Sequence, residues 1–196
     1  ATVSDSLGNL LFYTDGITVW NKFHDTMLNG FGLFGGASST QAAQIVKKPG
    51  YNQIYYIFTT DDITGNVSSN KGINYSIVDM NLDGQNGAVT IKNVKLVDNS
   101  AEKISTTLHK NRKDVWITVV RRGTDQLYTY LLSESGLSLP KIYRNIGNIV
   151  GGNAWNQYGS GQMKFSINGK HLAYVDMNAN SNHYIHILDF DNSNGN

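Results

Sequence analysis

Short apolar runs separated by polar turn residues follow one another along the whole chain. The first two runs, in GNLLFYTDGITVWNK at residues 8–22, meet at Asp15 and Gly16. An Asp-Gly pair favours a two-residue turn in which both residues have positive φ, because glycine tolerates that region freely and aspartate better than most residues. This stretch therefore predicts an antiparallel β-hairpin.

The central run of this pattern recurs along the sequence. Its four copies are NLLFYTD (9–15), QIYYIFTTD (53–61), DVWITVV (114–120) and KHLAYVD (170–176). A further apolar run follows each copy, and in the last three copies another run, closed by a tight polar turn, comes before it. A fourth run appears twice, at 88–96 and 139–147. The repeating unit is a four-stranded meander, with predicted units at 1–37, 38–97, 98–150 and 151–196.

A meander that repeats with insertions is typical of a β-propeller, in which each unit forms one four-stranded antiparallel blade. A β-sandwich also uses many short strands, but it does not require the same turn chemistry to return in register. Helix signals are nearly missing, so we expect an all-β fold and a single propeller of about four blades. The last unit stops after its third strand, which favours an incomplete part of a larger, possibly seven-bladed, ring. The remaining blades of the same parent chain are then expected partners.

Composition narrows the possible functions. The chain of 196 residues carries 16 Lys and Arg against 15 Asp and Glu, a formal net charge of +1. This balance is not the electrostatic footprint of a nucleic-acid-binding protein. Cysteine is absent, which excludes a disulfide framework and thiolate metal sites. No run approaches the roughly 18 apolar residues of a membrane helix, so we expect no membrane insertion.

The segment MKFSINGKHLAYVD (163–176) is similar to a propeller repeat of the tryptophan-aspartate-like PD type. The matching positions are Phe165, Ser166, Asn168, Gly169 and Lys170, with Ile167 where that repeat usually has proline. The stretches VSDSLGNLLFYTDGITVWNKFHDTMLNG, SSTQAAQIVKKPG, IYYIFTTD and INYSIVDMNLDGQNG resemble the propeller-like amino-terminal domain of large secreted surface proteins of gliding and related Bacteroidota. The resemblance implies type IX secretion, a place on the extracellular face of the outer membrane and a link to adhesion and gliding motility. It carries over no catalytic residues.

Connection lengths predict where ligands bind. The turns between first and second strands are short, whereas the connections at 29–39, 59–72 and 150–161 are long. Alternate connections of a meander emerge at the same end, so one face is elaborated. The candidate binding residues on this loop-rich face are Phe31, Phe34, Arg121, Arg122, Trp155 and Tyr158. Aromatic side chains flanked by Gly and Asn suit recognition of protein or glycan, although Phe34 and Trp155 equally suit packing between blades.

Other candidate sites have simpler interpretations. Asp79, Asn81 and Asp83 resemble the opening of a calcium loop, but the twelfth position is Thr90 rather than glutamate, and tight-turn chemistry is favoured. Asp189 and Asp191 form a similar array. The run HKNRK (109–113) is cationic and is interpreted as a solvated turn. No convincing catalytic residue, transition-metal site or cofactor is predicted.

The sequence thus favours a noncatalytic interaction or adhesion module of a secreted or cell-surface protein. Two alternatives remain open. A propeller enzyme acting on extracellular polysaccharide would need convergent carboxylates or a His and Tyr pair. A structural spacer or cap in a secreted multidomain protein would bind no ligand.

Overall fold

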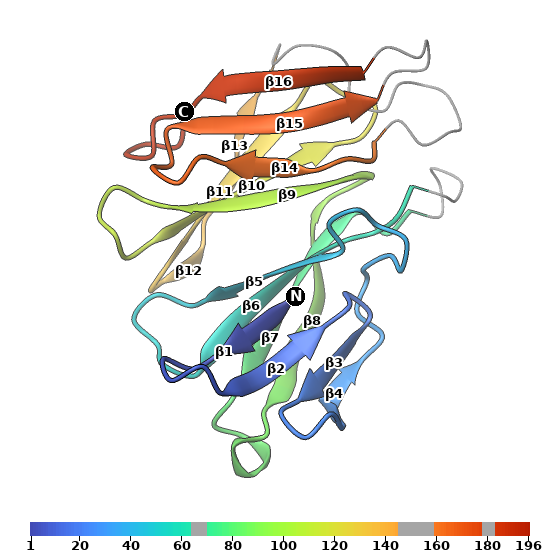
Figure 1. Cartoon of the computed structure of the whole chain (residues 1–196), viewed down its shortest axis with the longest axis vertical. Coiled ribbons are helices and arrows are strands. Elements are labelled where there is room, and N and C mark those ends of the chain that lie inside the picture. Colours follow the sequence, from blue (N-terminus) through green and yellow to red (C-terminus); the bar gives the residue numbers. More distant parts are fainter. Residues whose placement is uncertain (64–69, 145–158, 178–182) are drawn as a thin grey trace.

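The chain folds almost entirely into β-strands. The computed structural model describes residues 1–63, 70–144, 159–177 and 183–196 (Figure 1). Within these ranges the only helical element is one short 3-10 turn, η1 (Asp83–Gln85). The predicted all-β class is confirmed. None of the described segments is a helix long and apolar enough to cross a membrane.

The strands form four antiparallel meanders in chain order, which we call meanders 1 to 4. Meander 1 contains β1 (Thr2–Ser4), β2 (Leu10–Thr14), β3 (Thr18–Asn21) and β4 (Thr26–Phe31). Meander 2 contains β5 (Ala43–Lys47), β6 (Ile54–Thr60), β7 (Ile73–Asp79) and β8 (Ala88–Val97). Meander 3 contains β9 (Ser100–Leu108), β10 (Val115–Arg121) and β11 (Leu127–Ser133), with β12 (Gly136–Leu137) and β13 (Lys141–Tyr143) both paired to β11. Meander 4 contains β14 (Met163–Phe165), β15 (His171–Met177) and β16 (His183–Asp189).

The first hairpin forms, but the prediction of a two-residue turn at Asp15 and Gly16 is wrong. Thr14 pairs with Val19, so the connection is longer, and of these two residues only Gly16 has a positive φ, of 101°. The Asp15 carboxylate accepts hydrogen bonds from the backbone N–H groups of Ile17 and Thr18, both at 2.8 Å. This side-chain turn competes successfully with the two-residue turn because it satisfies two backbone donors at once.

Consecutive meanders pack face to face over three apolar cores. Successive residues of β6 point to opposite faces, as in any strand. Ile57 belongs to the core shared with meander 1, whereas Phe58 belongs to the core shared with meander 3, and both are fully buried. A third core joins meander 3 to meander 4 through Trp116 and Tyr174. Burial on both faces explains why the central strands read as nearly continuous apolar runs rather than as an alternation.

Meanders 1 and 2 are also joined edge to edge, which the expectation of separate blades did not include. Their last strands, β4 and β8, pair in parallel at Leu28 and Ala88 and unite both meanders in one strongly curved eight-stranded sheet. The Asn93 side chain donates to the Gly32 carbonyl at 2.9 Å and accepts from the Phe34 N–H at 3.0 Å. At this seam, hydrogen bonds of amide side chains therefore take the place of a regular ladder of backbone hydrogen bonds.

The first strands of meanders 2, 3 and 4 lie side by side. β9 contacts both β5 and β14, and Figure 1 shows β9 running between these two strands. Because β9 is the central member, the residues at its start lie where three meanders meet.

Candidate functional site

The connections between meanders converge at one end of the molecule, which we call the connection face. The Gly36 N–H donates to the Thr60 carbonyl at 3.0 Å, and the hydroxyls of Ser39 and Thr60 lie 2.8 Å apart. The Gly161 N–H donates to the Thr40 hydroxyl at 3.2 Å. These bonds tie the segment after β4 to the end of β6 and to the segment before β14. The described parts of the three long connections thus belong to one surface, supported by a common backbone framework.

Glu102 is the centre of the buried polar network beneath this face. It lies in a bulge of β9, where residues 101–103 stand opposite Val120 alone, and its φ is 52°. The carboxylate, in a side chain that is 2% exposed, accepts from the N–H and the hydroxyl of Thr40 at 2.8 and 2.9 Å. It also accepts from the Ile63 N–H at 2.9 Å. Buried charge is tolerated when it is hydrogen-bonded in this way.

Lys103, the next residue of the bulge, ties β9 to meander 4. Its ammonium is fully buried and donates to the carbonyls of Gly159 and Ser160 at 2.6 and 2.7 Å. The Gln41 side chain reinforces the same junction by accepting from the Met163 N–H at 2.8 Å. Glu102 and Lys103 therefore act as structural joints, and their polar atoms are engaged in fixing backbone segments.

Arg122 belongs to the same network and does not present a free cation at the surface. Its side chain is 5% exposed and donates to the Ile63 carbonyl at 3.4 Å. Burial lowers the pKa of the Arg122 guanidinium, while the nearby Glu102 carboxylate acts in the opposite direction. The predicted binding residue Arg122 is therefore placed under the connection face, whereas its neighbour Arg121 is only partly buried at the end of β10.

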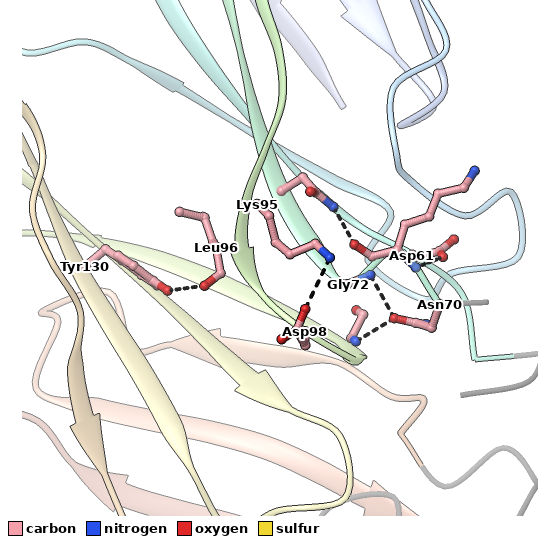
Figure 2. Close-up of polar contacts among 10 residues, drawn as sticks. Asp61, Asn70, Gly72, Lys95, Leu96, Asp98 and Tyr130 are labelled. Carbon is pink, nitrogen blue, oxygen red and sulfur yellow. Dashed lines mark hydrogen bonds and ion pairs between the residues drawn. The ribbon is translucent and has the colours of Figure 1, made fainter. Parts of the chain in front are cut away.

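Asn70 shapes the adjoining edge of the connection face (Figure 2). Its carbonyl oxygen accepts from the N–H groups of Gly72 and Ser100 at 2.8 and 2.9 Å, and its amide donates to the Asp62 carbonyl at 2.7 Å. Nearby, Lys95 and Asp98 form an exposed ion pair at 3.2 Å. A single amide therefore joins the β6–β7 connection to the start of β9.

Phe31 and Phe34 lie close in sequence at the end of β4 but differ in environment. Phe31 is 69% exposed, and the Lys92 ammonium donates to its carbonyl at 2.8 Å. Phe34 is partly buried, with the Lys71 ammonium 5.0 Å from the centre of its ring. Phe31 therefore presents its ring to solvent, whereas the Phe34 ring is partly packed, with a lysine side chain near it. The other two predicted aromatic residues, Trp155 and Tyr158, lie outside the described residues.

The two candidate calcium loops are hydrogen-bonded turns. Asp79 accepts from the N–H and the side-chain amide of Asn81 at 2.8 and 2.9 Å, and Asp83 begins η1. Asp191 accepts from the Ser193 N–H and hydroxyl at 2.9 and 2.7 Å, and these bonds lower the pKa of its carboxyl. Across the ranges that the structure describes, no three His, Cys, Asp or Glu side chains are grouped as metal ligands.

Sequence reasoning missed the Glu102, Lys103 and Gln41 network. The available signal was the charged pair inside SAEKIST, a segment that otherwise reads as a buried strand. Charged residues at a buried strand position are almost never fully buried unless each has a partner. The adjacent Glu102 and Lys103 therefore indicated a departure from regular strand geometry.

In comparisons with known proteins, no protein-family model matches the chain, and no curated protein matches it.

Proposed function

We propose that the chain is a noncatalytic interaction module that binds protein or glycan at its connection face. The observation that carries this proposal is the contrast between a fixed framework and an exposed aromatic side chain. The buried polar groups Glu102 and Lys103 are engaged by backbone partners beneath this face, while Phe31, at the end of β4 where the long connection to β5 begins, is 69% exposed. Rigid aromatic anchors on a fixed scaffold are typical of binding sites, since little conformational entropy is lost on contact.

We also propose that the four meanders are consecutive blades of a propeller. Three cores between successive meanders and the contacts of β9 with β5 and β14 support this arrangement. The edge-to-edge seam of meanders 1 and 2 is an addition to it. In this proposal the module belongs to a secreted or cell-surface bacterial protein, and further blades of the parent chain are its intramolecular partners. That part rests on the sequence resemblance alone.

The Phe31→Ala variant tests the binding proposal. A glycan array and a displayed peptide library, each probed with the whole chain, should yield ligands whose binding falls at least about tenfold in Phe31→Ala, the loss typical of an aromatic anchor. Leu139→Ala is the matched control, because Leu139 is 90% exposed and lies outside this face. Ligands that bind both variants equally well, or the absence of any ligand in both screens, would contradict the proposal.

A further inference from the structure

We propose that the opposite end of the molecule binds an anionic polysaccharide. The tight turns β5–β6 and β9–β10 emerge at this end, which we call the turn face. These turns and the last residue of β5 carry five basic side chains: Lys47, Lys48, Lys110, Arg112 and Lys113. All are exposed except Lys48, which is partly buried. In the sequence HKNRK stands alone and reads as one solvated turn, whereas the fold adds the two lysines of a neighbouring turn.

Two contiguous grooves gather these cations. The first, of about 650 Å³, lies between the β5–β6 turn and β9 and is lined by Lys47, Lys48 and Lys113. The second, of about 630 Å³, lies between the β9–β10 and β14–β15 turns and is lined by Lys110 and Arg112. Thr107 and Leu108 of β9 line both grooves, so the two adjoin along this strand.

The backbone around the grooves is fixed. The Lys110 N–H donates to the Asn192 carbonyl at 3.0 Å, and the His109 ring lies 3.0 Å from the Ser193 carbonyl oxygen. Gly169 fits so closely against Thr107 that a Cβ atom there would lie 2.5 Å from the hydroxyl oxygen. The turns of meanders 3 and 4 are thereby held against each other, which fixes the backbone that carries Lys110, Arg112 and Lys113.

The positive charge of the grooves is not neutralised by ion pairs. No carboxylate lines either groove, and among the described residues none of the five cations forms an ion pair. Four acidic residues border the grooves: Asp5, Asp114, Glu134 and Asp191. Asp5 lines an adjoining pocket together with Lys47, the Glu134 side chain lies against Gly50, and Asp191 interacts electrostatically with Lys110. The Asp114 carboxylate accepts from the Asn111 amide at 2.8 Å, and Asp191 is bonded within its own turn. Five cations against these four bordering carboxylates leave an excess of one positive charge, and within the grooves themselves the cations stand without a carboxylate.

The groove chemistry favours a polysaccharide over a nucleic acid. Hydroxyls and amides of Thr106, Thr107 and Asn168 can bond sugar hydroxyls, while the 54% exposed Leu108 offers an apolar surface to a sugar ring. Single-stranded nucleic acids are bound on exposed aromatic platforms. Two aromatic rings line these grooves. Tyr51 has the Lys48 ammonium 3.8 Å from its centre, and the partly buried His109 ring packs against Trp116. The anionic groups of the ligand are sulfates or carboxylates, and both chemistries fit the same cations.

Binding of the whole chain to immobilised polymers tests this inference. We expect binding to heparin, which is sulfated, or to polygalacturonate, which is carboxylated, and none to neutral dextran. The stronger of the two anionic polymers identifies the charged group. Affinity should fall steeply with added salt, as for exposed charges. The triple variant K110Q/R112Q/K113Q should weaken binding by about tenfold or more, and K47Q/K48Q should weaken it as well.

The matched control is K22Q/K95Q/K164Q, which removes the same charge from residues outside both grooves. It should change the affinity by less than about threefold. Far-ultraviolet circular dichroism and thermal melting of each variant establish that it is folded. The inference is overturned if neither anionic polymer binds, if the control loses as much affinity as the groove variant, or if single-stranded DNA binds as tightly as the better polysaccharide. These outcomes are independent of Phe31, so they leave the proposal for the connection face separately testable.

Discussion

At the residue scale, polar side chains that bond to backbone hold the meanders together. Tyr130 on β11 is an example, because its hydroxyl donates to the Leu96 carbonyl of β8 at 3.0 Å (Figure 2). The ring is 2% exposed and lies in the core between meanders 2 and 3. A buried hydroxyl of this kind requires a partner, and here the partner belongs to the neighbouring meander.

Because Tyr130 is buried, the free energy of unfolding is expected to fall at alkaline pH. Burial raises the pKa of the Tyr130 hydroxyl above its ordinary value of 10.0. The folded protein therefore holds this proton more tightly than the unfolded chain does, so the contribution is fully present below about pH 10 and is lost as the pH rises further. Burial also raises the pKa values of Tyr55 and Tyr56, which act in the same direction.

Tyr130→Phe should lower the free energy of unfolding by about 1 kcal/mol at pH 7, because one hydrogen bond between meanders is lost. It should also reduce the fall in stability between about pH 9 and 11. Urea unfolding followed by tryptophan fluorescence across this pH range measures both effects. Tyr184→Phe, at a 39% exposed position, is the control and should change neither. An unchanged pH slope in Tyr130→Phe would contradict this role.

At the scale of elements, some features follow directly from the sequence. The apolar runs at 53–61 and 114–120 predict β6 and β10, and the polar turns between runs predict where strands end. The β4–β8 seam could not be predicted in this way. It depends on Asn29 and Asn93, which have positive φ values of 56° and 60° and whose amides donate hydrogen bonds across the seam. Local patterns contain no information about such long-range partners.

The bulge of β9 is the second element that local patterns do not predict, and Glu102 tests its importance. Glu102→Ala removes the acceptor of three hydrogen bonds and leaves the buried Arg122 without a nearby carboxylate. We expect a loss of about 3 kcal/mol in the free energy of unfolding. Glu134→Ala is the matched control, since Glu134 is an exposed glutamate in a turn, and it should lose less than about 0.5 kcal/mol. Similar urea midpoints for the two variants would show that the network is not a structural joint.

At the scale of the whole molecule, the order of the meanders determines which surfaces exist. The connection face and the turn face are assembled from segments far apart in sequence, and each requires consecutive meanders to pack in chain order. The repeat predicts this order, and it predicts that the long connections share one end. The sequence does not predict the merging of cations at the turn face, because Lys47 and Arg112 are brought to adjoining grooves only by the fold.

Double-mutant cycles across β6 test this packing order most directly. Ile57 shares a core with Val19 of meander 1, whereas Phe58 shares a core with Ile117 of meander 3. Combining Ile57→Val with Val19→Ala, and Phe58→Leu with Ile117→Val, should give interaction energies of about 0.5 kcal/mol or more in urea unfolding. The crossed pair Ile57→Val with Ile117→Val should be additive within about 0.3 kcal/mol. Strong coupling in the crossed pair, with additivity in the other two, would contradict the packing order on which both proposed surfaces depend.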